Sequence, residues 1–267
     1  MLNSLQNKLL EMITWLSAFI DEHNLRYYAI GGTFLGAVRH NGFIPWDDDL
    51  DIAMPRPDYE ILINLLSKQT NHYIIEYPQN KSKDFLYNFA KLYDTNTTMV
   101  EKLRINVKRG VYIDIFPLDG LGNTYEESLE NYKEIDRCNM LLAIRSCAFR
   151  KDRKWWKNLM ILCGRLIPIK ASFLAFKVNE LCKKRNYDEC LYVASCMSPY
   201  RQREIMKKEF FGTPKEYSFE NIKIKGPELA DEYLSHLFGK WQELPPEDKR
   251  HSAHDFIYLD LEKPYMT

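Results

Sequence analysis

Four aspartates within five positions are the feature of this 267-residue chain that most directly suggests chemistry: Asp47, Asp48, Asp49 and Asp51. From Asp49 to Ile52, acidic and apolar residues alternate, which predicts a strand with one buried face. Side chains at i and i+2 of a strand point to the same face, so Asp49 and Asp51 should project together. Two carboxylates on one edge suit a hard divalent cation, Mg²⁺ or Mn²⁺, because such cations prefer oxygen ligands.

The alternative is a solvated acidic turn that follows Pro45 and Trp46. A solvated turn, however, has no need for the alternation with Leu50 and Ile52. Paired acids on an apolar strand also repel each other unless a cation neutralises them. The pattern therefore favours a metal site, and a bound cation would in turn suit a phosphate.

The segment before the aspartates must help to position this site. Residues 27–30 predict a strand that enters a Gly-Gly-Thr turn at 31–33, and residues 33–38 predict a short helix. The backbone N–H groups of Gly32 and Thr33 would then face outward at a helix N-terminus, an arrangement that binds phosphate. A glycine pair by itself indicates only a turn that needs positive φ.

These residues carry a family resemblance. The glycine pair followed by Asp49-Leu50-Asp51-Ile52 resembles the signature of the nucleotidyltransferase superfamily related to DNA polymerase beta. The fuller string over residues 31–52 resembles the LicD branch of phosphocholine transferases, to which fukutin and fukutin-related protein are also similar; residues 110–120 extend this resemblance. It implies an α+β fold, in which a nucleotidyltransferase-like mixed sheet is flanked by helices and carries an appended helical subdomain.

In that superfamily a third carboxylate comes from a neighbouring strand, and Asp114 in the expected strand 111–116 matches this place. The resemblance thus implies three catalytic residues that are also metal ligands: Asp49, Asp51 and Asp114. Asp has low strand propensity, so Asp114 should have a partner. An ion pair with Arg109 or another base is the alternative. Asp119, which precedes Gly120, is expected to form a turn.

A further set of residues would bind the donor: Gly31, Gly32, Thr33, Arg39 and Lys91. Arg39 has the fork geometry that suits two phosphate oxygens. Lys91 lies in the expected strand 85–93, where the resemblance implies a lysine that meets a phosphate; a solvated charge is the alternative. Trp46 or Tyr112 would stack on a base or cover a quaternary ammonium. The C-terminal part offers three more candidates that would return to the site: Arg250, His251 and His254.

The resemblance implies transfer of a phosphoalcohol, most typically phosphocholine from CDP-choline, to a sugar hydroxyl of a cell-surface glycan such as a teichoic acid, lipopolysaccharide or capsule precursor. The partners would be a CDP-alcohol donor and a glycan or lipid-linked oligosaccharide acceptor. Three alternatives remain: an NTP-dependent nucleotidyltransferase, a metal-dependent glycosyltransferase, and an inactive membrane-associated scaffold. The short distance from the Gly-Gly-Thr turn to the acids argues against the glycosyltransferase.

Composition narrows the classes of partner and compartment. The 37 basic and 37 acidic residues give a formal net charge of +0, which offers no broad electrostatic footprint for nucleic acid. The six cysteines contain no Cys-x-x-Cys pair, so free and mostly buried thiols are expected. No signal peptide and no run of about 20 apolar residues is visible, which predicts a cytoplasmic protein.

Changes in character along the chain predict three parts: a catalytic core at 1–122, a helical subdomain at 123–190, and an α/β extension at 191–267 that packs back on the core. Apolar spacing predicts the first helix over residues 4–23. Residues 150–169 combine basic side chains, two tryptophans and an apolar run. This pattern suits peripheral contact at the inner face of a membrane, but an ordinary helix pair with a core face and a solvated basic face is favoured.

Overall fold

The computed structural model describes residues 2–79, 85, 87–101, 106–147, 149, 154–196, 200–251 and 256–265. Two features named above, the basic run at 150–153 and His254, lie outside these residues.

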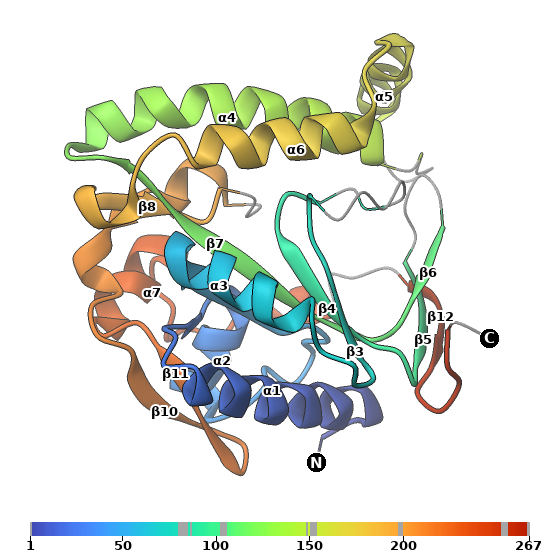
Figure 1. The fold of residues 1–267 in the computed structure, drawn as a ribbon, viewed down its shortest axis with the longest axis vertical. Coiled ribbons are helices and arrows are strands. Elements are labelled where there is room, and N and C mark those ends of the chain that lie inside the picture. Colours follow the sequence, from blue (N-terminus) through green and yellow to red (C-terminus); the bar gives the residue numbers. More distant parts are fainter. Residues whose placement is uncertain are drawn as a thin grey trace.

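A mixed sheet forms the centre of the molecule (Figure 1). Its main strands run in the order β1 (Tyr28–Ala29), β2 (Asp51–Pro55), β7 (Tyr112–Gly122), β4 (Ala90–Asp94) and β3 (Tyr73–Glu76). β2 and β7 are parallel, and the other pairings in this order are antiparallel. The far end of β7 also pairs with β8 (Tyr192–Ala194), which in turn pairs with β9 (Met206–Lys207). This mixed sheet and its helices confirm the α+β class.

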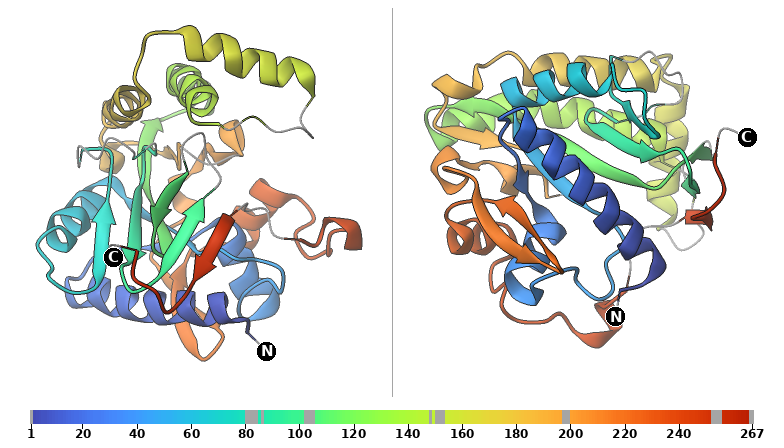
Figure 2. Two further views of the ribbon diagram at one scale, coloured as in Figure 1. Left: turned by 90° about the vertical axis from the view of Figure 1, so that its right-hand side faces the viewer. Right: turned by 60° about the horizontal axis from the view of Figure 1, so that its bottom comes forward.

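Helices cover both sides of the long strand β7 (Figure 1). On one side lies α1 (Ser4–Glu22), which a capping box of Asn3 and Gln6 begins. On the other side lie α4 (Tyr125–Ser146) and α6 (Ala171–Cys182), and α5 (Trp155–Leu166) crosses the outside of α4 (Figure 2). The remaining helices are α2 (Gly31–His40), α3 (Arg56–Leu66) and α7 (Ala230–Phe238).

Two smaller sheets complete the fold. The hairpin of β10 (Lys215–Phe219) and β11 (Ile222–Gly226) lies beside α2 and β1 (Figure 1). The order in the second small sheet is β12 (Phe256–Asp260), β5 (Thr98–Glu101) and β6 (Val107–Arg109). Within the described chain, one-turn 3₁₀ segments occur at Tyr187–Glu189, Arg201–Glu204, Lys208–Phe210 and Glu247–Lys249.

Several predicted boundaries were wrong. β2 begins at Asp51 rather than Asp49, although the Leu50 carbonyl already accepts a hydrogen bond from the Asp114 N–H (3.0 Å). The helix α2 begins at Gly31 rather than Thr33, so the glycine pair is its first turn. β4 begins at Ala90, five residues later than expected.

β7 is longer than the expected strand 111–116, and this corrects the assignment of Asp119 to a turn. Asp119 lies inside β7, 1% exposed, and its carboxylate accepts two hydrogen bonds from the Arg56 guanidinium (2.6 and 2.8 Å). The ion pair satisfies a charge that burial alone would make costly. Asp119 is therefore part of the packing between β7 and α3.

All six cysteines lie in the described part of the chain, and none is in a disulfide. Three of them, Cys182, Cys190 and Cys196, are buried. The expected core face of α5 is not formed, because most of its apolar side chains are exposed.

Candidate active site

One row of charged side chains crosses three adjacent strands of the central sheet. Asp51 of β2 lies opposite Asp114 of β7, and Asp114 lies opposite Lys91 of β4. Directly opposite residues of paired strands place their side chains on the same face. The register therefore brings together the acid pair that the sequence could only place on separate segments.

The N-terminus of α2 approaches these acids closely. Gly31 has φ +53°, in the left-handed region that favours glycine. A Cβ on Gly31 would lie 3.7 Å from Asp51 Oδ2, and one on Gly32 would lie 2.8 Å from Asp47 Oδ2. The Thr33 hydroxyl accepts a hydrogen bond from the Asp51 N–H (2.9 Å). The glycine bend and the aspartates therefore form one site.

The acids and the glycines open into a pocket of about 640 Å³. Its walls come from α2, the segment before β2, the central sheet and the C-terminal part of the chain. Among the predicted residues it is lined by Gly31, Gly32, Arg39, Trp46, Asp49, Asp51, Asp114 and His251. The pocket also contains Asp47 of the acidic cluster, and residues that were not singled out from the sequence, among them Tyr200, Glu204 and Trp241.

The pocket acids lie in a strongly negative, poorly solvated environment. Burial raises the pKa of Asp51 well above its usual range, and the neighbouring carboxylates of Asp49, Asp114 and Asp47 raise it further. Burial also raises the pKa of Asp114 to about 6, although the Lys91 ammonium opposes that rise. Burial is the larger cause of both shifts, and a nearby positive charge would favour the ionised form of each carboxyl group.

Lys91 forms an ion pair with Asp114 and is not among the residues that line the pocket. Its ammonium lies 2.9 Å from Asp114 Oδ1 and 3.8 Å from Glu101 Oε1, and the residue is only 2% exposed. It sits 3.3 Å from the ring centroid of Tyr112 and 4.5 Å from that of Tyr87, and both hydroxyls donate to Glu101. The partner of Asp114 is thus Lys91, whereas Arg109 pairs with Glu76.

Two aromatic candidates therefore differ in what they can contact. The Lys91 ammonium covers one face of the Tyr112 ring, and Tyr112 is buried and is not among the residues that line the pocket. Trp46 lines the pocket, and the Arg250 guanidinium lies 5.7 Å from its ring centroid. Arg39 also lines the pocket, where its Nη1 donates to the backbone carbonyl of Trp241 (2.8 Å).

The donor set fits a hard divalent cation. Asp47, Asp48 and Asp49 each place a carboxylate oxygen within 4.8 Å of the others. Asp51 and Asp114 line the same pocket as Asp47 and Asp49. Besides burial, the charges of Asp49, Asp114 and Asp47 all act to raise the pKa of Asp51, which places these carboxylates near one another. Carboxylate oxygens without thiolate or imidazole favour Mg²⁺ or Mn²⁺ over softer metals.

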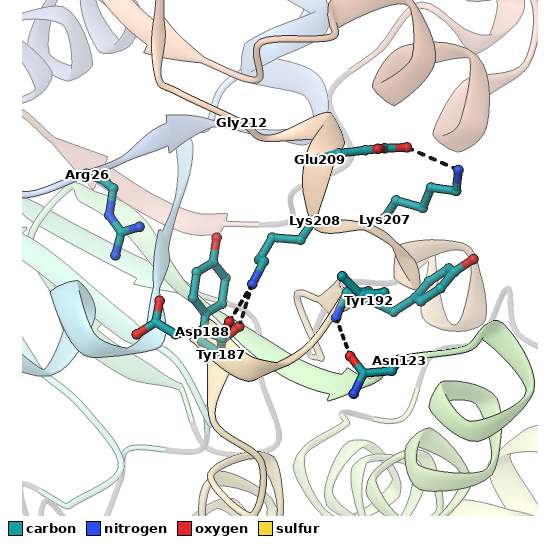
Figure 3. Close-up of a pocket in the computed structure, with 10 residues that line it drawn as sticks. Arg26, Asn123, Tyr187, Asp188, Tyr192, Lys207, Lys208, Glu209 and Gly212 are labelled. Atoms are coloured by element: carbon teal, nitrogen blue, oxygen red, sulfur yellow. Dashed lines mark hydrogen bonds and ion pairs between the residues drawn. The ribbon is translucent and has the colours of Figure 1, made fainter.

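A second pocket, of about 540 Å³, lies around Tyr187 (Figure 3). Its basic side chains have partners within the protein. Lys208 donates to the carbonyls of Tyr187 and Asp188, Lys207 pairs with Glu209, and Arg26 pairs with Asp58. This pocket lacks the convergence of carboxylates seen at the first one.

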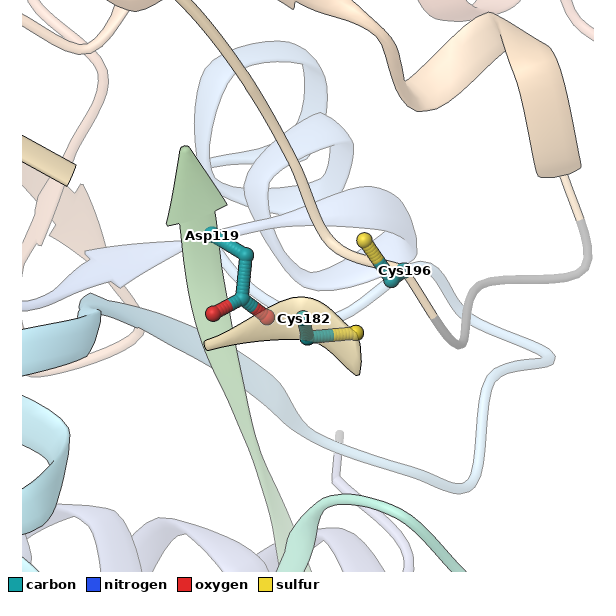
Figure 4. A group of neighbouring side chains, drawn as sticks. All are labelled: Asp119, Cys182 and Cys196. Atoms are coloured by element: carbon teal, nitrogen blue, oxygen red, sulfur yellow. The ribbon is translucent and has the colours of Figure 1, made fainter. Parts of the chain in front are cut away.

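A separate group of potential ligands comprises Asp119, Cys182 and Cys196 (Figure 4). The Asp119 carboxylate is already held by Arg56. A hydrogen bond with Cys182, together with burial, raises the pKa of the Cys196 thiol well above its usual range. We therefore assign this group to core packing between α6 and the sheet.

The chain is similar to known proteins over most of its length. The family model described as LicD/FKTN/FKRP, nucleotidyltransferase domain, matches residues 24–157. The chain is 26% identical over 253 residues, 92% of each protein, to the lipopolysaccharide cholinephosphotransferase LicD of Haemophilus influenzae. It is 51% identical over 39 residues to uncharacterised proteins of Rickettsia prowazekii (15% of each chain) and Rickettsia typhi (15% of this chain and 13% of that protein).

Proposed function

The chain belongs to the LicD/FKTN/FKRP nucleotidyltransferase-domain family, as its sequence motifs predicted, and we propose that it transfers a phosphoalcohol from a CDP-alcohol to a sugar hydroxyl of a cell-surface glycan. Phosphocholine is the group we propose first, because the relative that covers 92% of the chain is a lipopolysaccharide cholinephosphotransferase. The observation that carries the proposal is the convergence of Asp49, Asp51 and Asp114 with the α2 N-terminus on one pocket.

In this proposal Asp49, Asp51 and Asp114 would hold Mg²⁺ or Mn²⁺, and Asp47, which lies near Asp49 in the same pocket, would be a further ligand. When bound, the cation would neutralise charge on the donor diphosphate and on the leaving nucleotide. The chain's own residues then position the reactants. Such positioning and charge stabilisation supply most of the rate in phosphoryl transfer.

The backbone at the start of α2 is proposed to hold the donor diphosphate. The N–H groups of a helix N-terminus are natural phosphate donors, and the absence of side chains on Gly31 and Gly32 lets phosphate oxygens approach. Arg39, in the last turn of α2, lines the same pocket, and its guanidinium is proposed to donate hydrogen bonds to the donor phosphates.

The bond changes follow from that arrangement. The acceptor hydroxyl oxygen attacks the phosphorus next to the alcohol, the bond from that phosphorus to CMP breaks, and CMP leaves. The hydroxyl proton passes to a pocket carboxylate. Lys91 is proposed to keep Asp114 ionised and fixed in position rather than to meet the donor phosphate.

A panel of CDP-alcohols tests the proposal. The protein is incubated with Mg²⁺, an acceptor glycan and CDP-choline, CDP-ethanolamine, CDP-glycerol or CDP-ribitol, and CMP release is measured. We expect release with one of these donors, loss of turnover in Asp51→Asn, and full activity in the control Asp188→Asn, an exposed acid of the second pocket. Near-normal activity of Asp51→Asn would remove it from the metal site, and pyrophosphate release from CTP would indicate a nucleotidyltransferase instead.

A further inference from the structure

The helix α5 turns its apolar side outward. Trp155, Leu159, Leu162 and Leu166 follow the spacing i, i+4, i+7 and i+11, which places them on one helical stripe. These four residues are 76%, 49%, 51% and 78% exposed. An amphipathic helix of a globular protein normally buries such a stripe, so this one lacks a partner among the described residues.

The opposite side of α5 fixes this orientation. Ile161 is 5% exposed, and Gly164 packs so tightly on α4 that a Cβ there would lie 2.2 Å from Ile144 Cγ2. Figures 1 and 2 both place α5 outside α4, on the side away from the sheet. A rotation of α5 that buried its stripe would lose the close contact at Gly164.

The charge around the stripe has one sign. Residues 154–178 contain five basic residues and no acidic one, although the whole chain has a formal net charge of +0. The basic residues are Lys154, Lys157, Arg165, Lys170 and Lys177. The lysines among them are exposed. On α6, Phe173 and Phe176 add exposed aromatic area, at 56% and 42%.

We propose that α5 lies flat on an anionic lipid bilayer, with its apolar stripe in the headgroup region and the lysines of 154–178 on acidic lipids. An apolar stripe with tryptophan and a basic surround has the chemistry of an interfacial helix. Stable attachment takes two signals, and the segment 154–178 combines an apolar stripe with exposed lysines. No helix in the described residues is long and apolar enough to cross a membrane. The proposal does not depend on the transfer reaction.

Vesicle sedimentation of the full chain tests it. We expect binding to vesicles of phosphatidylglycerol and phosphatidylcholine, and weaker binding to phosphatidylcholine alone. Leu159→Ser with Leu166→Ser should weaken partition about tenfold or more, since each exposed leucine contributes apolar area to insertion. Lys157→Gln with Lys170→Gln should remove most of the preference for the anionic lipid.

Matched controls are available on other exposed surfaces. Ile61→Ser with Leu191→Ser, at residues 49% and 60% exposed, removes equal apolar character elsewhere. The double variant Lys68→Gln and Lys215→Gln removes two positive charges at exposed positions away from α5. Circular dichroism and thermal unfolding of each variant check that the fold is intact.

Two results would overturn the proposal. The first is partition of the parent chain no greater than that of a soluble control protein, or an equal loss in the control variants. The second is a parent chain that does not bind vesicles and forms a dimer in analytical ultracentrifugation, where the double variant Leu159→Ser and Leu166→Ser is a monomer. That result would make the stripe a contact between two copies of the chain. CMP release with a soluble acceptor should be unchanged in the α5 variants, so this test can fail while the proposed reaction stands.

Discussion

Replacing Lys91 with methionine separates two explanations of this lysine. In the structure its ammonium lies 2.9 Å from Asp114 Oδ1, inside a cage of Tyr87, Tyr112 and Glu101. If it acts through Asp114, Lys91→Met should weaken Mg²⁺ binding at neutral pH, and high pH should restore it. If instead it contacts a donor phosphate, donor binding should fall at every pH.

The magnitude follows from the protonation of Asp114. Its pKa is raised to about 6 with Lys91 present. An opposite charge at this distance lowers a carboxyl pKa by about 1 to 3 units, so its removal should raise that of Asp114 to roughly 8. At pH 7 the ionised fraction then falls from about nine tenths to about one tenth, and Mg²⁺ affinity falls about tenfold. At pH 9 most of that loss should disappear.

The assay is calorimetric titration of Mg²⁺ from pH 6 to pH 9, with Lys207→Met, an exposed lysine, as the control. Circular dichroism first confirms that the variant folds, because removing one partner of a buried ion pair costs about 3–5 kcal/mol. A tenfold loss of Mg²⁺ affinity that is equal at pH 7 and pH 9 would refute the idea that Lys91 acts by keeping Asp114 ionised. Unchanged Mg²⁺ affinity with weakened CDP-alcohol binding would restore the phosphate role predicted from the sequence.

Three further predictions concern the glycine bend, the core and pH. Gly32→Ala should abolish CMP release. It should change the free energy of unfolding by no more than about 1 kcal/mol, because the added Cβ meets only the flexible end of a side chain. Gly31→Ala, at φ +53°, should lower the free energy of unfolding by about 1–2 kcal/mol. Arg56→Met should lower the free energy of unfolding in urea by about 3–5 kcal/mol, against under about 0.5 kcal/mol for the exposed Lys223→Met, because it leaves a buried carboxylate unpaired. In EDTA, Asp51→Asn should be more stable than the parent at pH 7.5 and lose that advantage towards pH 4. A carboxyl whose folded pKa is raised binds extra protons in the folded state, so its contribution falls as pH rises above its unfolded value; an advantage that grew towards pH 4 would contradict this.

The acid cluster could be predicted because its signal is local. Asp49 and Asp51 are two positions apart, and the glycine bend lies less than twenty residues before them. Adjacent chain segments with strong hydrophobic periodicity constrain each other, so the strand and the helix around the bend were predicted to within a few residues. The helix α1 (Ser4–Glu22) was predicted over residues 4–23 for the same reason, since its apolar spacing is regular over five turns.

The partner of Asp114 could not be predicted, because it depends on strand register. Lys91 reaches Asp114 only because β4 pairs with β7 antiparallel in one particular alignment, and a shift of one residue would turn the lysine to the other face. Glu101 and Tyr87 join the same cage from segments with no shared motif. The orientation of α5 was missed for a similar reason, since periodicity shows that a helix has an apolar stripe but not which way the stripe faces.

The two aspartates of β7 lie in different surroundings, one at the pocket and one in the packing between β7 and α3. Asp114 and Asp119 are five positions apart, an odd number, so the pleat sends their side chains to opposite faces of the sheet. On one face Asp114 pairs with Lys91 and lines the pocket, as the proposed metal site requires. On the other face, Asp119 is buried and accepts hydrogen bonds from Nε and Nη2 of the Arg56 guanidinium. Arg56 belongs to α3 and also donates to Asn179 of α6. Sequence context suggested a turn at Asp119 because Gly120 follows it, but Gly120 lies inside the strand. A Cβ at Gly120 would come within 2.8 Å of Cys190 Sγ, so close packing explains the glycine at this position. The strand therefore carries one carboxylate that lines the pocket and a second, buried one that packs β7 against α3, and each is paired with a different basic side chain.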